Sequence, residues 1–357
     1  MKSIKVLDFK DKILYFRKMN FLRKILFPFA ILYGFITSIR NLFFDKGILK
    51  STAFDVPIIA VGNLSVGGTG KTPQIEYLIR LLSEKYKVAT LSRGYKRKSK
   101  GFVLANEASN AESLGDEPFQ YYQKFLPIQV AVDANRTNGI QRLLAQKNPP
   151  EIILLDDAFQ HRKVKAGLYI LLTAYNDLYC DDFMLPTGNL RESKNGANRA
   201  TIVIVTKCPS TISQHEKDKI KSKLNLKSNQ KLFFTSIGYD ETVFSKNKQI
   251  PVTEIQKMDK VLLAGIAKPE PFFNHLKKEG DEVLKFPDHH DFSENEILKI
   301  KEKAKNKLVI TTEKDYVRIK DAFSDENLFY LPIQSLFLEN KEDFDETILK
   351  FVKDFTN

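Results

Sequence analysis

The sequence predicts an α/β protein with a larger domain, built on a mainly parallel sheet, and a smaller second α/β domain. Short apolar runs alternate with amphipathic helical patterns, and this alternation restarts at Lys260 after a polar stretch. Alternation of this kind is typical of parallel sheets, whose crossover connections are usually helices. A length of 357 residues also exceeds one ordinary domain. We therefore expect two domains.

The composition is that of a globular protein, with 43% hydrophobic and 28% charged residues. The formal net charge of +12 favours anionic partners: a nucleotide, a phospholipid surface or a nucleic acid. The two cysteines, Cys180 and Cys208, have no metal-binding spacing. A disulfide framework is therefore not expected, and a reducing cytoplasm fits the chain.

Residues 1–45 predict a membrane-docking segment. Basic and aromatic residues fill positions 2–24, and an uncharged run follows from Ile25 to Ile39. The run is shorter than the roughly 20 residues of a bilayer span. It suits a helix lying in the interface of an anionic membrane. A buried helix packed on the sheet remains an alternative. A signal peptide is not expected, because no small-residue cleavage site follows the run.

The first strand and helix of the larger domain enclose a glycine-rich loop. The apolar run Val56–Val61 predicts a strand, and the apolar spacing from Ile75 to Leu82 predicts a helix. The loop residues expected to bind nucleotide are Val66, Gly67, Gly68, Thr69, Gly70, Lys71, Thr72 and Pro73. Backbone N–H groups and the helix N-terminus in such a loop cradle a polyphosphate. A phosphate-loop (P-loop) NTPase-like domain is the prediction.

Two side chains of this loop have expected roles toward ATP and Mg²⁺. Lys71 is placed to reach the β- and γ-phosphates, and the Thr72 hydroxyl to bind Mg²⁺. The generic motif has glycine where this chain has Ser65, but Gly67 and Gly68 still supply flexibility. Downstream, the apolar run Ile152–Leu155 predicts a buried parallel strand that carries Asp156 and Asp157 to the nucleotide edge, a Walker B-type pattern.

Two further charged groups stand beside predicted elements. The loop Arg93–Lys98 follows a strand at 87–92, at the edge where open α/β sheets bind ligands, although a solvated charge run is the alternative. Asp116 and Glu117 open a helix that runs to Phe125, and the helix dipole alone can stabilise them there. The remaining elements expected in this half are strands at 128–132, 168–173 and 201–206 and a helix ending near Ala145. The stretch 210–250 is expected to form a helix and an extended connection between the domains.

The smaller domain begins at about residue 259 by the same pattern. Its expected strands are 261–265, 283–286, 308–312 and 328–332, and its expected helices are 271–278, 294–305 and 344–355. The motifs Phe286–Asp291 and Thr311–Asp315 sit at strand ends, where side chains can reach a cleft between domains.

Taken in order, these motifs resemble the tetraacyldisaccharide 4′-kinase family of lipid A biosynthesis, over nearly the whole chain. The resemblance rests on Val61–Pro73, Ser92–Tyr95, Gly115–Pro118, Asp156-Asp157 with Phe159–His161, Pro186–Gly188 with Leu190–Glu192, Gly265–Ala267 with Pro269, Asp288-His289 and Thr312–Asp315. The family carries Ser or Thr at the position of Ser65. Ala158 departs from the family, which has glycine there, so we expect a local difference beside Asp157.

The resemblance implies an ATP- and Mg²⁺-dependent kinase that phosphorylates the 4′-hydroxyl of a tetraacyl glucosamine disaccharide 1-phosphate. It implies a P-loop core at 46–230, an extended linker at 231–258 and a C-terminal domain at 259–357. It also implies a membrane-associated location at the cytoplasmic face of the inner membrane. No nucleic acid and no obligate protein partner are expected.

The resemblance implies the roles of Asp116 and His289, and the chemistry of phosphoryl transfer suggests the others. Asp116, assisted by His289, would accept the proton of the sugar hydroxyl, and Lys71 would hold the phosphates. Glu117 and Asp157 would complete the Mg²⁺ site with Thr72, directly or through water, with Asp156 as a second candidate. Arg93, Lys96 and Arg191 are expected to bind the sugar and its 1-phosphate, because arginine suits bidentate phosphate contacts.

Three other classes of protein share single features with this chain. A GTPase would carry a carboxylate where Pro209 follows Thr206-Lys207-Cys208, and a membrane-bound partitioning ATPase would carry lysine in place of Val66. A nucleic-acid binder would account for the positive charge, but no recognition motif accompanies it. The kinase interpretation is therefore preferred.

Overall fold

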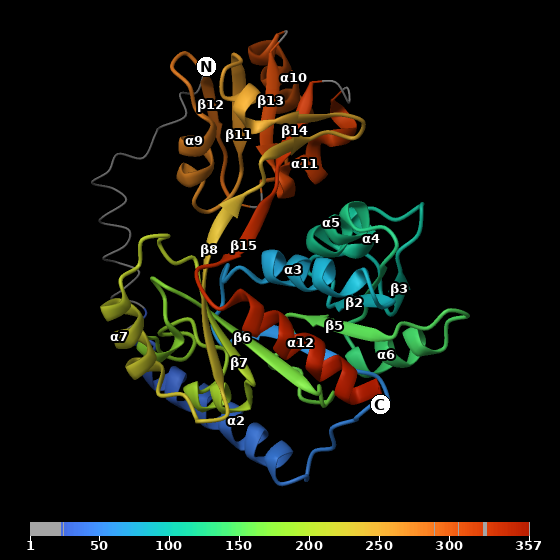
Figure 1. Ribbon diagram of the computed structural model, residues 1–357, viewed down its shortest axis with the longest axis vertical. Helices are drawn as coiled ribbons and strands as arrows, with labels where there is room; N and C mark the ends of the chain where they lie inside the picture. Colours follow the sequence, from blue (N-terminus) through green and yellow to red (C-terminus); the bar gives the residue numbers. More distant parts are fainter. Residues whose placement is uncertain (1–22, 24, 289, 306, 324–326, 357) are drawn as a thin grey trace. The chain divides into compact units, whose positions relative to one another are not determined.

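The computed structural model describes residues 23, 25–288, 290–305, 307–323 and 327–356, which belong to two compact units (Figure 1). Unit 1 holds the described residues up to Lys71, residues 155–236 and the described residues from 337 onward. Unit 2 holds residues 72–154 and the described residues of 237–336. The domain boundaries expected from the sequence stay a prediction.

The central strands of unit 1 form a parallel sheet in the order β1, β6, β7, β8. These strands are β1 (Ile58–Asn63), β6 (Leu168–Ala174), β7 (Ile202–Thr206) and β8 (Lys231–Tyr239). Val61 pairs with Ile170, and Leu172 pairs with Ile204. All residues of β1 and β7 are buried, which explains their near-continuous apolar sequences.

Unit 2 contains two groups of strands. The first is β2 (Val88–Ser92), β4 (Gln129–Val132) and β3 (Val103–Leu104), with β2 and β4 parallel and β3 antiparallel to β4. The second is a six-stranded sheet in the order β10-β9-β14-β13-β11-β12. Its strands are β9 (Thr242–Phe244), β10 (Gln249–Pro251), β11 (Lys260–Ala264), β12 (Glu282–Lys285), β13 (Leu308–Thr312) and β14 (Leu328–Leu331). Strands β11 to β14 are parallel, and β9 with β10 forms an antiparallel edge hairpin.

Helices follow the strands at the predicted places. The helices are α2 (Phe27–Asp45), α3 (Lys71–Ser83), α4 (Ala111–Leu114), α5 (Asp116–Lys124), α6 (Arg136–Leu144), α7 (Gln214–Leu224), α8 (Val252–Ile255), α9 (Glu270–Leu276), α10 (Glu294–Ala304), α11 (Glu313–Ile319) and α12 (Lys341–Thr356). Strands β5 (Ile152–Asp156) and β15 (Ile333–Phe337) complete the main elements. The predicted strands and helices are confirmed. The sequence prediction missed β3, α4, the β9–β10 hairpin, α8, α11 and β15, which are short or polar.

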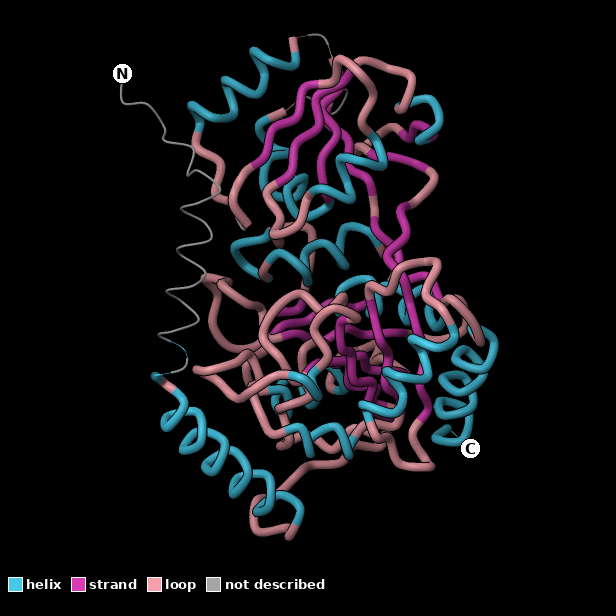
Figure 2. The backbone as a smooth tube through the Cα atoms, turned by 90° about the vertical axis from the view of Figure 1, so that its left-hand side faces the viewer, coloured by secondary structure: helices cyan, strands magenta, loops and turns pink. Residues whose placement is uncertain are grey.

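Helix α2 lies along the surface of unit 1 (Figures 1 and 2). Its length and apolar composition are sufficient to cross a membrane, but only 6% of its most apolar window is buried. Ala30 and Phe44 are its buried residues, whereas Phe29 and Phe35 have 61% and 63% of their surfaces exposed. The alternative of a buried helix is therefore wrong. The basic flank predicted at 2–24 lies outside the described residues except for Arg23.

The six-stranded sheet contains a fully buried ion pair. The Nζ of Lys260 lies 2.7 Å from Oδ2 of Asp281, and both side chains are 0% exposed. The Asp281 carboxylate also accepts hydrogen bonds from the backbone N–H groups of Lys260 and Lys278. Removing one partner of a buried pair costs more than the pair itself contributes, because the other charge stays desolvated.

We therefore expect Lys260→Met to lower the free energy of unfolding by about 3–5 kcal/mol. Adding Asp281→Asn should recover part of this loss, because the unpaired charge is then removed. Urea unfolding measures both variants against Lys303→Met, which breaks an exposed pair with Glu282 and should change stability by less than about 1 kcal/mol. Equal stabilities of Lys260→Met and Lys303→Met would contradict this account.

Candidate active site

The glycine-rich loop, predicted to bind phosphates, begins after Asn63 in unit 1 and connects β1 to α3. Gly67 and Gly70 have φ angles of +114° and +82°, a conformation that favours glycine. Gly62 is required for a different reason: the backbone of β1 approaches Phe159 closely there, and a Cβ on Gly62 would lie 2.7 Å from Cβ of Phe159. These glycines allow the backbone of the loop to turn tightly before the helix that starts at Lys71.

Residues at the end of β7 brace this loop. The Thr206 hydroxyl donates to the carbonyl of Thr69 at 2.8 Å, and the Lys207 ammonium donates to the carbonyl of Gly68. The backbone N–H of Val66 donates to the carbonyl of Asn189 at 2.8 Å. The Thr206-Lys207 pair that resembles a guanine-reading motif thus supports the phosphate loop.

The Asp157 carboxylate stands between two cations of unit 1. Lys71 Nζ lies 3.6 Å from Oδ1 of Asp157 and donates to Oδ1 of Asn63 at 3.2 Å. The Nη1 of Arg191 lies 2.9 Å from each carboxylate oxygen of Asp157. Asp157 has a φ of +48°, whereas Asp156, the last residue of β5, is buried. The arrangement places Lys71, Arg191 and Asp157 at one position.

A buried carboxylate, that of Glu192, organises the loops around that position. Glu192 is 3% exposed and accepts hydrogen bonds from Gln160, Arg199 and Asn41 at 2.8–3.0 Å. Gln160 also donates to the backbone carbonyl of Asn63 at 2.8 Å. This network joins the end of β1, the segment after β5 and helix α2.

Asp116 and Glu117 lie in unit 2, in the first turn of α5. Gly115, at φ +92°, precedes them. Asp116 is paired with Arg318, and Oε1 of Glu117 lies 3.2 Å from Nζ of Lys314. Both cations come from α11, and the sequence prediction assigned neither of them a role, although Lys314 lies in the motif Thr311–Asp315.

The remaining residues predicted to bind substrate or assist catalysis are exposed, already paired with Asp157, or outside the described residues. Arg93 and Lys96 follow β2 and are exposed, with Lys96 at a φ of +59°. The structure places Arg191 on Asp157, so its role toward the substrate stays a prediction. His289 lies outside the described residues, and its neighbour His290 contacts Glu296 at 3.1 Å.

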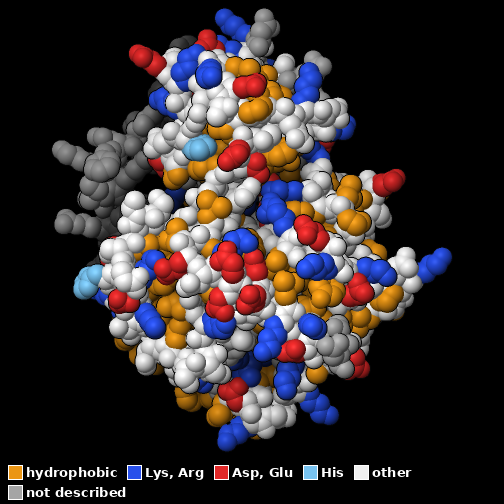
Figure 3. Space-filling model, viewed as in Figure 1, with side chains coloured by type: hydrophobic (Ala, Val, Ile, Leu, Met, Phe, Trp, Pro, Cys, Tyr) orange, Lys and Arg blue, Asp and Glu red, His pale blue; other side chains and the backbone are white. Residues whose placement is uncertain are grey.

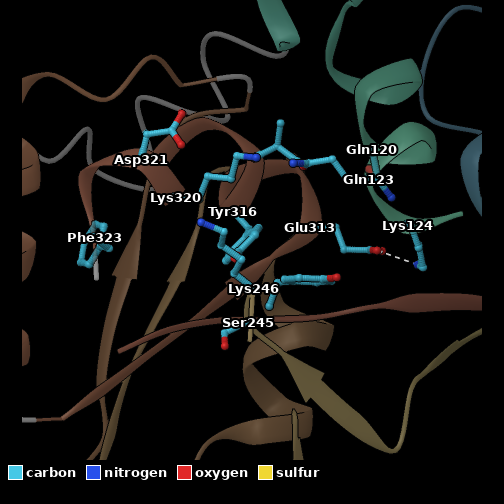
Figure 4. A pocket seen from close by; sticks show the side chains of 12 residues that line it. Gln120, Gln123, Lys124, Ser245, Lys246, Glu313, Tyr316, Lys320, Asp321 and Phe323 are labelled. Atoms are coloured by element: carbon cyan, nitrogen blue, oxygen red, sulfur yellow. Dashed lines mark hydrogen bonds and ion pairs between the residues drawn. The ribbon is translucent and has the colours of Figure 1, made fainter. Parts of the chain in front are cut away.

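A cavity of about 470 Å³ lies beside α5 and α11 in unit 2 (Figure 4). On its wall Lys124 pairs with Glu313 at 2.6 Å, and Lys124 also pairs with Glu76 at 2.7 Å. Glu76 and Glu313 have only 1% and 7% of their side chains exposed. Burial and the charge of Glu76 raise the pKa of Glu313 to about 7, against the opposing effect of Lys124.

Charges of both signs are interspersed on the face shown in Figure 3. The positive excess of the sequence is thus not gathered into one patch on this face. Within the described residues, no group of three or more His, Cys, Asp or Glu side chains that could hold a metal is found.

The raised pKa of Glu313 predicts a pH-dependent stability. Because the folded protein binds this proton more tightly than the unfolded chain, the free energy of unfolding should fall as pH rises from about 4.5 to about 7. Glu313→Gln removes the titration. We therefore expect the free energy of unfolding of the variant, relative to that of the parent, to be higher at about pH 8 than at about pH 5. Urea unfolding at the two pH values measures this difference. The exposed Glu254→Gln is the control, and an unchanged difference between parent and Glu313→Gln at both pH values would contradict the prediction.

Comparison with known proteins places these features in one family. The tetraacyldisaccharide-1-P 4′-kinase family model matches residues 22–353. A tetraacyldisaccharide 4′-kinase of Flavobacterium johnsoniae is 66% identical over 336 residues, covering 94% of this chain and 99% of the relative. The corresponding kinase of Bacteroides thetaiotaomicron is 46% identical, with 94% of each chain covered.

A solved structure agrees with the sequence relatives. The crystal structure of LpxK from Aquifex aeolicus in complex with ATP is 31% identical and has a TM-score of 0.74. The match covers 93% of this chain and 99% of the other. Together with the family model and the relatives, this likeness confirms the resemblance inferred from the sequence motifs. The chain belongs to the tetraacyldisaccharide-1-P 4′-kinase family.

Proposed function

We propose that the protein transfers the γ-phosphoryl group of ATP to the 4′-hydroxyl of a tetraacyl glucosamine disaccharide 1-phosphate in lipid A biosynthesis. The observation that carries this proposal is the phosphate loop with Lys71 beside Asn63 and Asp157, in a chain of this kinase family. The ATP in the Aquifex aeolicus structure supports the nucleotide. Phosphoryl transfer requires charge neutralisation and in-line positioning more than covalent chemistry, which suits such a loop.

In this proposal the loop residues Val66–Pro73 surround the phosphates. The backbone N–H groups near Gly68 and Gly70 donate to phosphate oxygens, and Lys71 neutralises charge on the β- and γ-phosphates. Lys71 already faces a carboxylate, so it exchanges one anionic partner for another when the nucleotide binds. Pro73 has no N–H to offer, but in the first helical turn that donor has no intrahelical acceptor.

Carboxylate and hydroxyl oxygens at this site fit Mg²⁺, which prefers hard oxygen ligands and keeps several waters. Asp157, partly exposed and already facing Lys71 and Arg191, is the carboxylate we assign first, with buried Asp156 as the second candidate. Thr72 and Glu117 are the further residues that would hold the ion. When bound, Mg²⁺ would neutralise charge on the phosphates.

Asp116 is proposed to accept the proton of the sugar hydroxyl, with assistance from His289. A hydroxyl is a poor nucleophile and gains from a positioned base. Asp116 stands in the first turn of α5 and pairs with Arg318, which fixes where its carboxylate lies. Exclusion of water during the transfer would limit wasteful hydrolysis of ATP.

We further propose that the protein works as a peripheral protein at the cytoplasmic face of the inner membrane. Helix α2 exposes a broad apolar surface, while Asn41 and Tyr33 anchor it to the loop that holds Arg191 and Glu192. The acyl chains of the substrate would lie along the apolar residues of α2. Arg93, Lys96 and Arg191 would then bind the sugar and its 1-phosphate.

The proposal predicts that ATP turnover depends on the acylated disaccharide and adds the mass of one phosphoryl group to it. Asp116→Ala should lower kcat by about 10²–10⁴-fold, because a general base is lost, with little change in ATP affinity. The measurement is mass detection of the lipid product together with ATP consumption. Glu112→Ala, which removes an exposed carboxylate paired with Lys98, is the matched control. Consumption of ATP without a mass increase would leave only an ATPase.

The apolar face of α2 predicts membrane binding. Replacing Phe29, Phe35 and Ile36 by serine should weaken partitioning onto anionic vesicles by roughly 100-fold, since each side chain contributes buried apolar area. Vesicle sedimentation measures the effect. The matched control replaces Leu126 and Leu298, which are also exposed but lie elsewhere, and should bind as the parent does. Unchanged binding of the α2 variant would contradict the assignment.

A further inference from the structure

Helices α5 and α11 of unit 2 are joined by ion pairs among the described residues. Asp116 pairs with Arg318, Glu117 with Lys314 and Lys124 with Glu313. The first two pairs lie at the start of α5, and the third lies at its end. The order of partners along α11 is reversed, so the two helices are held in an antiparallel alignment.

This arrangement fixes α5 in two ways. Ion pairs at both ends oppose sliding of the helix along α11, and the apolar cluster of Leu114, Phe119, Val132 and Val317 opposes its rotation. The pair of Lys124 with Glu313 is largely desolvated, with 15% and 7% of the two side chains exposed, so water screens it weakly. The position of the carboxylates at the start of α5 therefore depends on α11.

Arg318 is itself held by a contact with a residue at the start of α11. Its Nη1 lies 4.0 Å from Oδ1 of Asp315, which is fully buried. Asp315 in turn accepts hydrogen bonds from the backbone N–H of Gly265 at 2.8 Å and from the Thr312 hydroxyl at 2.7 Å. A Cβ on Gly265 would lie 2.9 Å from Oδ1 of Asp315, which explains the glycine. A continuous chain of contacts thus runs from the end of β11 to the Asp116 carboxylate.

We propose that Arg318 is a positioning residue that orients the Asp116 carboxylate for proton acceptance. This inference rests on the proposed role of Asp116. The planar guanidinium engages Oδ2 of Asp116 and sets the direction of the carboxylate. Arg318 acts only through Asp116 and touches no reacting atom in this proposal.

The test measures Arg318→Met both alone and combined with Asp116→Ala. Alone, Arg318→Met should lower kcat by about 10–100-fold, because a small misplacement of a catalytic group is costly. The KM for ATP should not change. Arg318→Lys should restore part of kcat, because an ammonium keeps the charge but loses the planar contact. In the Asp116→Ala background, Arg318→Met should cause no further loss, since residues that act as a unit are non-additive.

Controls separate this role from general stability. Lys285→Met breaks an exposed pair with Glu270 in the same unit and should leave kcat unchanged. Thermal unfolding is measured for every variant, and Arg318→Gln replaces Arg318→Met in the comparison where the latter does not fold. Full kcat in the Arg318 variant, or a loss that persists in the Asp116→Ala background, would overturn the inference. Full kcat in Asp116→Ala alone would instead overturn the proposed role of Asp116.

Discussion

The Asp157 carboxylate balances two cations beside the glycine-rich loop of unit 1. Lys71 lies 3.6 Å and Arg191 2.9 Å from this carboxylate. Without Asp157, two positive side chains would face each other beside the positive end of α3, and mutual repulsion would displace them. With it, both cations are held in place. Preorganised charge of this kind needs little rearrangement when a ligand replaces the internal partner.

The loop that holds Arg191 is also connected to helix α2 on the surface of unit 1. The backbone carbonyl of Arg191 accepts a hydrogen bond from the Tyr33 hydroxyl of α2 at 3.0 Å. The following residue, Glu192, binds Asn41 of the same helix, and Arg162 pairs with Asp45 at its end. The polar side of α2 is therefore tied to the loops around Asp157, while its apolar side is exposed. A displacement of this helix would be transmitted to the loop that holds Arg191.

The sequence was sufficient to predict those parts of the fold in which a local pattern has one physical meaning. Strand β1, the glycine-rich loop and α3 follow from apolar spacing and from glycines, and β5 follows from four apolar residues before Asp156. The apolar run 25–39 also predicted α2, but the helix continues to Asp45. Polar residues at its end form ion pairs and hydrogen bonds with Arg162, which an uncharged-run criterion cannot detect.

The contacts that position the site could not be predicted, because they join residues far apart in the chain. Arg191 and Asp157 stand in different loops, and nothing in either local sequence indicates their pairing. Charge patterning also favours exposure for Glu76, Lys124 and Glu313, yet the three side chains bury one another. The polar sequence around Ser245 indicates a linker, whereas the structure has a hairpin there, closed by a hydrogen bond between the backbones of Ser245 and Lys248.

The structure explains each residue of the polar motif at the start of helix α11, which the sequence alone does not. In the run Thr312-Glu313-Lys314-Asp315, Thr312 caps the helix and Glu313 pairs with Lys124. Lys314 pairs with Glu117, and Asp315 binds the backbone of Gly265. Consecutive side chains on a helix point about 100° apart, so each of them meets a different neighbour. A short polar segment can thus hold α5, the end of β11 and its own first turn at once. These contacts explain why the segment is charged rather than apolar.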